Sequence, residues 1–281
     1  MSDSRARREE ADAIDWFHSI DLGDGVVTHG ASTTLVAENQ FPKLEGRTVL
    51  DVGAWDGYYS FLAERAGASQ VVALDNYVWG VDFGARDAYW NECFAEGRLP
   101  DQSRDLTDFW RPELPGRRGF DFAKATLGSK VEPRLADFAS ADLSPLGRFD
   151  VVFYLGVLYH MKEPLTCLER VRSVTNEVAV IETQAIHVQN LEHERILQFH
   201  PGGEINNDFG NWYVTSEAAL HSLCRAAGFS SVKTISGPPP APNVAAGQER
   251  ARFTRRRTSH ARAEQPSAPT ALYRLLVHAF A

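Results

Sequence analysis

The chain has 281 residues, enough for one large domain or for one domain with added segments. Hydrophobic residues make up 43% and charged residues 23%, which is ordinary globular composition, and no apolar run approaches the roughly 18 residues that span a bilayer. The formal net charge of −8 disfavours nucleic acid as the main partner, without excluding it, because phosphate binding calls for a basic face.

The N-terminal residues are charged and contain no apolar signal core, so we expect a cytoplasmic protein. Cys93, Cys167 and Cys224 are odd in number and widely spaced, which suits reduced thiols better than disulfides or a zinc site. Six arginines cluster late in the chain and are more typical of a solvated edge or tail than of a binding patch. They are Arg250, Arg252, Arg255, Arg256, Arg257 and Arg262.

Short apolar runs alternate with helical patterns from about residue 41 to residue 235, as in βαβ units of a mostly parallel sheet. The predicted strands are Thr48–Val52, Gln70–Asp75, Lys130–Leu135, Phe149–Tyr154, Val178–Thr183 and Val232–Ile235. The predicted helices are Tyr58–Ala66, Phe120–Leu127, Leu165–Val174 and Ser216–Ala227, the last with Thr215 or Ser216 as N-cap and Gly228 as its stop. Strands such as VLDVG and DVVFYLG are uninterrupted apolar runs, which indicates burial on both faces of the sheet.

Several segments depart from this pattern. We expect residues 1–40, with the aromatic stretch Trp16–Gly30, to form a lid or cap on a main domain of residues 41–281. Long insertions near residues 84–118 and 184–213 are typical of lids and binding loops. Residues 237–247 are expected to form a surface loop, and the chain after Thr258 to be partly flexible.

The most informative stretch is TVLDVGAWDGYYSFLAERAGASQVVALD. An apolar strand ends at Asp51, the chain passes through Gly53 and Gly57 into a helix, and a second strand ends at Asp75. Glycines after a first strand allow a ligand to approach the backbone, and an acid at the end of the second strand accepts hydrogen bonds from ribose hydroxyls. The pattern predicts an adenosine site at the C-terminal edge of the sheet.

The glycine spacing favours S-adenosylmethionine (SAM) over a dinucleotide as the cofactor. A dinucleotide fingerprint requires G-x-G-x-x-G, whereas Trp55 and Tyr58 stand at two of the places where glycines would be needed. The bulk of Trp55 is poorly compatible with a pyrophosphate, while SAM has no phosphate and carries an ammonium group that Asp51 can neutralise.

With these residues the chain resembles the class I SAM-dependent methyltransferases. DVGAWDG is similar to their first motif, D-x-G-x-G-x-G, with Trp55 in place of the middle glycine, and FDVVFYLGVLYHMKEP is similar to their fourth. The resemblance implies an α/β fold with a Rossmann-like, doubly wound, mostly parallel sheet of seven strands. It implies that Asp75 binds ribose and that Asp137 and Phe138, in RLADFAS, hold adenine. Ala54, Asn76 and Tyr154, at strand ends beside these motifs, complete the predicted cofactor residues.

GVLYHMKEPL more narrowly resembles the tRNA wobble-uridine carboxymethyltransferases and the small-molecule methyltransferases related to them. Openings like WFHSIDLGDGVVTHG and later stretches like NWYVTSEAAL are shared with the small-molecule enzymes. We therefore expect methyl transfer to a small, natural-product-like acceptor at an O, N or C atom. The alternatives are a tRNA-modifying enzyme, using SAM or its carboxylated form, and a non-catalytic SAM-binding partner.

Two residues at strand ends are candidates for the general base. Glu182 ends the apolar fifth strand, where desolvation would raise its pKa as a base requires; the alternative is a carboxylate bound to backbone or to an arginine. His160 follows the fourth strand and titrates near neutrality when unperturbed; the alternative is a loop histidine that caps the helix beginning near Pro164.

Aromatic residues are candidates for substrate contacts. Trp16 and His18, with Phe17 between them, either form an aromatic lid or pack on the core. Tyr159, Trp212 and Tyr213 are predicted pocket walls, and Tyr58 and Tyr59 are expected to divide between pocket and core. The cluster Glu204, Asn206, Asn207 and Asp208 is more typical of a turn than of a metal site, and we expect no bound metal.

Overall fold

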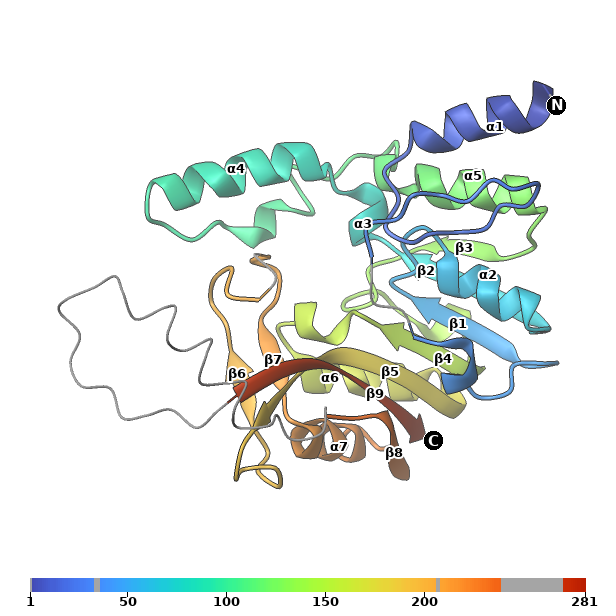
Figure 1. Ribbon diagram of the computed structural model, residues 1–281. Coiled ribbons are helices and arrows are strands. Elements are labelled where there is room, and N and C mark those ends of the chain that lie inside the picture. Colours follow the sequence, from blue (N-terminus) through green and yellow to red (C-terminus); the bar gives the residue numbers. More distant parts are fainter. Residues whose placement is uncertain (1, 33–35, 206–207, 239–269) are drawn as a thin grey trace, which may run out of the picture.

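A mixed sheet crosses the molecule with helices on both faces, as the computed structural model in Figure 1 shows for residues 2–32, 36–205, 208–238 and 270–281. Strands β3, β2, β1, β4 and β5 are parallel and lie in this order, so the chain reverses direction across the sheet between β1 and β4. Ligands of open α/β sheets bind at the carboxyl ends of the strands beside such a reversal. The strands are β1 Thr48–Val52, β2 Gln70–Asp75, β3 Glu132–Leu135, β4 Phe149–Leu155, β5 Thr175–Val188, β6 Leu197–Phe199, β7 Tyr213–Thr215, β8 Ser231–Ser236 and β9 Thr270–Phe280.

The predicted α/β class is confirmed, but within the described residues this sheet has nine strands rather than seven. Strand β9 lies antiparallel between β5 and β8. These three strands and β1–β4 together make seven. Strands β6 and β7 form an antiparallel pair that joins the far end of β5 through Ala185 and Thr215. These two short strands come from the predicted second insertion and the residues just after it, and residues 184–188 of that insertion continue β5.

The prediction of a flexible tail was wrong for residues 270–280. They form β9, and its side chains from Leu275 to Ala279 are buried. The late arginine cluster, most of the loop at 237–247 and residues 259–269 lie outside the described residues.

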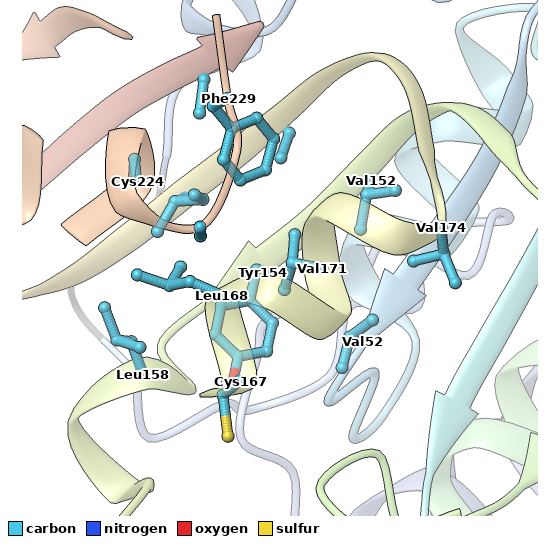
Figure 2. Close-up of a cluster of buried hydrophobic side chains, with 14 of the residues drawn as sticks. Val52, Val152, Tyr154, Leu158, Cys167, Leu168, Val171, Val174, Cys224 and Phe229 are labelled. Atoms are coloured by element: carbon cyan, nitrogen blue, oxygen red, sulfur yellow. The ribbon is translucent and has the colours of Figure 1, made fainter. Parts of the chain in front are cut away.

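Alternate strand residues supply two cores, one on each face of the sheet. On β1, Leu50 packs with α6 and α7, whereas Val49 packs with α2, α5 and the N-terminal segment. Figure 2 shows the first core, which contains Leu168 and Val171 of α6 and Val152 of β4. The longer helices are α1 Ser2–Asp12, α2 Tyr58–Arg65, α4 Phe83–Ala95, α5 Arg118–Leu127, α6 Pro164–Ser173 and α7 Glu217–Ala226, and a single turn, α3, spans Tyr77–Gly80.

Local signals for the last helix match its observed ends. Ser216 is the N-cap of α7, and its hydroxyl accepts a hydrogen bond from the amide of Ala219 at 3.2 Å. Gly228 follows the helix with a φ of +96°, a left-handed conformation that favours glycine. The predicted cap and stop of this helix are therefore confirmed.

The N-terminal segment is built into the second core. Ile20, Leu22 and Val26 are buried with residues of β1, α2 and α5. Helix α4, from the first insertion, extends from the sheet and stacks Phe94 on Phe209 with 3.5 Å between ring centroids (Figure 1). None of the helices in the described part of the chain is long and apolar enough to cross a membrane.

Candidate functional site

A cavity of about 1150 Å³ opens at the carboxyl ends of β1, β2, β4 and β5. The N-terminal segment, helix α4, the segment after β4 and strand β9 close its sides. Of the predicted site residues, twelve line it: Asp51, Gly53, Ala54, Trp55, Asp75, Asn76, Asp137, His18, Tyr159, His160, Glu182 and Trp212. The topology thus gathers residues that are up to 194 positions apart in the chain, from His18 to Trp212.

The loop between β1 and α2 forms one end of the cavity. Gly53 has a φ of +78°, and a Cβ there would lie 2.7 Å from the side chain of Val157, so only glycine fits. Trp55 adopts a left-handed φ of +49°, and its ring stacks on Phe17 with 4.0 Å between centroids. The large Trp55 side chain, which stands where the family motif has a glycine, therefore packs against the N-terminal segment.

Two buried carboxylates stand beside this loop. Burial raises the pKa of Asp51 to about 6, although a hydrogen bond from the Ser60 hydroxyl at 2.6 Å and the nearby His18 lower it. Burial likewise raises the pKa of Asp75 to about 6, while backbone amides, including those of Trp55 and Val78, oppose the rise. Each carboxylate has lone pairs left for a ligand that donates hydrogen bonds.

The donors and acceptors at this end fit SAM and do not fit a pyrophosphate. The amides of Gly53 and Ala54 donate to the carbonyl of Leu74, and the amide of Trp55 donates to Asp75, so none of the three points at a ligand. A pyrophosphate site needs such amides free. What the loop presents instead are carboxylates, which match an ammonium group and ribose hydroxyls.

The predicted adenine wall is only partly in place. Asp137 lines the cavity, but its carboxylate also accepts bonds from Ala139 and Ser140 of the following turn. Phe138 is 7% exposed and packs against Tyr154 in the first core, so Ala139 lines the cavity in its place.

Tyr154 also lies outside the cavity. Its side chain is fully buried in the first core, where Figure 2 shows its hydroxyl directed toward Cys167. Gly57 does not reach the lining either, because it caps α2 with a φ of +84° where a Cβ would meet Phe61 and Phe120.

Glu182 is held by an arginine, which was the alternative to a role as base. The Nε and Nη2 atoms of Arg274, on β9, donate to its two carboxylate oxygens, and Nη1 donates to Gln184 at 3.2 Å. Strand register explains the contact, since Arg274 lies opposite Gln184 and diagonal to Glu182 on the same face. Burial raises the pKa of Glu182, and the arginine opposes that rise.

His160 lines the cavity, and one of its ring nitrogens is bonded to the backbone. The carbonyl of Gly210 can only accept, so the Nδ1 atom at 3.0 Å carries the hydrogen, and the lone pair is on Nε2. Burial lowers the pKa of His160, whereas the nearby Asp208 raises it. A lowered pKa favours the neutral imidazole, the form that accepts a proton.

The aromatic candidates divide between wall and core. Tyr159 and Trp212 line the cavity, and the Trp212 amide donates to the carbonyl of Tyr159 at 2.8 Å. Trp16 packs in the second core with its indole bonded to Ala11, and Tyr213 starts β7 against Phe199. Tyr58 stacks on His18 behind the lining, while Tyr59 reaches the cavity, the division expected for this pair.

Glu204 and Asp208 form turns rather than a joint ligand set. Each carboxylate accepts a hydrogen bond from a glycine amide two residues away, those of Gly202 and Gly210. Asn206 and Asn207 lie outside the described residues.

Among the lining residues that sequence patterns did not reveal are Arg86, Trp90, Asp105 and Arg274. In the first insertion, Arg86 lies over the ring of Trp90 at 4.3 Å and donates to Tyr77, whose hydroxyl donates to Asp105 at 2.7 Å. The aromatic and arginine content of helix α4 was the available signal. Arg274 sits in an apolar strand-like run, LYRLLVHAF, in which a single charge was a signal as well.

Comparison with known proteins shows the family of the chain. A family model for a methyltransferase domain matches residues 31–234. The chain belongs to this methyltransferase domain family, and SAM is the cofactor for which its cavity is built. The expected class I resemblance is thereby confirmed.

Among curated proteins, the chain is similar to the tRNA U34 carboxymethyltransferases of Pseudomonas putida W619, at 26% identity over 193 residues, and of Pseudomonas aeruginosa LESB58, at 29% over 201 residues. The alignments cover 68% and 69% of this chain but only 48% of each relative, so the chain spans about half their length. Among solved structures, the N-terminal domain of EvdMO1, determined in the presence of SAH and D-fucose, superposes with a TM-score of 0.58 at 16% identity. The match covers 100% of this chain and 97% of that one. It shows a shared fold.

Proposed function

We propose that this protein transfers a methyl group from SAM to a small, natural-product-like molecule that binds in the same cavity. The observation that carries the proposal is the cavity itself. Its volume of about 1150 Å³ exceeds the roughly 300–1,000 Å³ of an ordinary ligand site, which leaves room for an acceptor beside the cofactor. SAM supplies the electrophilic methyl group, and the chain positions the acceptor and removes water.

The charges of the lining support a small molecule over tRNA. Among the described residues, eight carboxylate side chains line the cavity against three lysine or arginine side chains, which disfavours a phosphate-rich acceptor. The carboxylates are Asp51, Asp75, Asp87, Asp105, Asp137, Glu163, Glu182 and Asp208.

The same lining argues against a carboxylated form of SAM, because that cofactor needs an additional cation near the transferred group. Arg274 is bound to Glu182 and Gln184, and Arg86 is bound to Asp87 and Tyr77. Lys162 lies over the ring of Trp212 at 4.9 Å. Each lining cation thus already has a protein partner.

His160 is the better of the two candidate bases. His160 lines the cavity and its Nδ1 is bonded to Gly210, which leaves Nε2 to accept a proton, whereas the carboxylate oxygens of Glu182 are occupied by Arg274. A base matters for a hydroxyl or carbon acceptor and is not needed for a neutral amine. Glu182, through its ion pair, helps to fix the cavity wall that faces the acceptor.

The first test is calorimetric titration of the protein with SAM, S-adenosylhomocysteine (SAH) and NAD. Micromolar binding of the first two without NAD binding supports the cofactor assignment, whereas absence of SAM binding, after mass spectrometry has excluded a co-purified ligand, overturns it. Methyl transfer is then measured by mass spectrometry with phenolic, amine and sugar acceptors and with unmodified tRNA. Sugars belong in the panel because the EvdMO1 domain was crystallised with D-fucose.

The outcomes separate the three functions. Transfer to a small molecule but not to tRNA supports the proposal. Transfer to tRNA favours the modifying enzyme, and SAM binding without turnover on any acceptor favours a non-catalytic partner.

A further inference from the structure

His18 and Asp56 form a buried pair at the cofactor end of the cavity. The Nδ1 atom of His18 lies 2.6 Å from Oδ1 of Asp56, and because a carboxylate only accepts, Nδ1 carries the hydrogen. The other oxygen, Oδ2, accepts from the amides of Phe17 at 3.1 Å and His18 at 2.7 Å. Asp56 is 2% exposed, so one carboxylate from the β1–α2 loop fixes both the segment and the ring.

The second ring nitrogen of His18 is left for a ligand. Within the described part of the chain, Nε2 has no hydrogen-bond partner, yet it is not among the polar atoms sealed from solvent. His18 lines the cavity, and its ring is fixed by stacking on Tyr58 with 5.0 Å between centroids and by the edge of Tyr59 at 5.4 Å. The atom that faces the cavity is therefore held in one place.

The position of this nitrogen matches the amino-acid end of the cofactor. His18 lies close enough to Asp51 to lower the pKa of that carboxylate, and both residues line the end of the cavity formed by the β1 loop. Asp51 is suited to the ammonium group of SAM. The α-carboxylate of the same amino acid needs a donor nearby, and the amides of Gly53, Ala54 and Trp55 are already committed to protein acceptors.

We propose that His18, oriented by Asp56, donates its Nε2–H to the α-carboxylate of SAM while Asp51 receives the ammonium group. The proposal rests on SAM as the cofactor of the proposed function. In the doubly protonated ring, Nδ1–H donates to Asp56 and Nε2–H to the ligand, so the imidazolium lies between two carboxylates. His18 is thus a cofactor-binding residue that holds one group of the cofactor.

Three probes isolate that group: SAH, its decarboxylated analogue S-adenosyl-3-thiopropylamine, and 5′-methylthioadenosine, which lacks the whole amino acid. We expect wild-type protein to bind SAH about 10- to 100-fold more tightly than the decarboxylated analogue in calorimetry, as for one charged hydrogen bond. His18→Ala should abolish this difference by weakening SAH alone. His29→Ala, at an exposed histidine of the same segment, is the matched control and should keep it.

Unchanged binding of the decarboxylated analogue to His18→Ala would also show that the variant is folded. The proposal is overturned if His18→Ala weakens SAH and the analogue equally, or if it leaves SAH binding unchanged. Failure of wild-type protein to bind any of the three probes would instead refute the proposed function, so the two failures are distinguishable.

Asp56→Asn tests the orienting carboxylate. Two backbone amides occupy Oδ2, so the carbonyl of Asn must face them and its NH₂ must face Nδ1 of His18. The ring then carries its single hydrogen on Nε2, which ¹⁵N NMR of the imidazole detects. We expect the preference for SAH to fall by a smaller factor than in His18→Ala, because a donor remains without its charge. An undiminished preference alongside the altered NMR signature would contradict the orienting role.

Discussion

Arg274 and Glu182 lie 92 residues apart in the chain and form a two-pronged ion pair on the wall of the cavity. The Glu182 side chain is 8% exposed and that of Arg274 is 30% exposed. Each charge has therefore lost most of its contact with water and is stabilised by the opposite charge of its partner. The pair joins β5 to β9 across the register that sets Arg274 opposite Gln184.

Removing one member of this pair should cost more than removing both. We expect Glu182→Gln or Arg274→Met alone to lower the free energy of unfolding by about 3 kcal/mol, because the remaining charge is left without its partner. The double variant should recover part of this loss, which urea unfolding of the four proteins measures. Additive losses would mean that the two side chains act independently.

Asp75 should be essential for cofactor affinity and dispensable for folding. Asp75→Ala removes the carboxylate proposed to accept the ribose hydroxyls, and we expect the Kd for SAH to rise at least about 10-fold. Asp142→Ala, at an exposed aspartate outside the cavity, serves as the control. Retained SAH affinity in Asp75→Ala, with an intact circular dichroism spectrum, would place the ribose elsewhere.

The carboxylates proposed to bind the cofactor predict how SAH affinity depends on pH. Asp51 and Asp75 each have a pKa of about 6, and only the ionised forms attract an ammonium group and accept two hydroxyl hydrogens. We expect the Kd for SAH to rise as pH falls from 7 to 5, by up to about 10-fold per pH unit for each carboxylate. A constant Kd across this range in calorimetry would contradict the assignment.

The same burial makes Asp51 a source of instability at neutral pH. Its folded pKa of about 6 lies above the ordinary 3.8, so its contribution to stability is fully present below pH 3.8 and is lost as pH rises through 6. The difference corresponds to about 3 kcal/mol above pH 6. Asp51→Asn should therefore gain thermal stability relative to wild type as pH rises from 4 to 7, and a pH-independent difference across this range would refute this.

His160 should control turnover rather than binding. We expect His160→Ala to lower kcat at least about 100-fold for a hydroxyl acceptor while the Kd for SAH changes little, since general bases contribute on this scale. Because burial lowers the pKa of His160, wild-type kcat should persist below pH 6.5 and decline only in more acidic buffer. Wild-type turnover by both His160→Ala and Glu182→Gln would mean that the base lies elsewhere or is not needed.

Local motifs were sufficient to predict that Asp51 and Asp75 line one end of the cavity. Asp51 and Asp75 end apolar strands on either side of a glycine loop, and this arrangement depends on fewer than thirty consecutive residues. Strands β1 and β2 have the predicted bounds for the same reason. The alternation of side chains along β4 also predicts that Tyr154 is buried rather than in the cavity. Tyr154 shares a face of the strand with Val152, and both belong to the same core.

The acceptor end could not be predicted in this way. Arg274 reaches the cavity only because β9 pairs with β5 in one register, and such long-range antiparallel pairing leaves no local mark in the sequence. Helix α4 was hidden for a related reason: its two buried side chains, Trp90 and Cys93, give it only a narrow apolar stripe.

The placement of β9 also determines what happens when the chain is shortened at its C-terminal end. Eleven residues of β5, from Val178 to Val188, are paired with β9 along one edge. A shortened chain that stops before Thr270 would expose this apolar edge, which is a template for pairing with other chains. Residues 270–281 thus cover the edge of β5 and also place Arg274 in the cavity wall. A shortened protein that lacks them would lose the covered edge as well as the arginine.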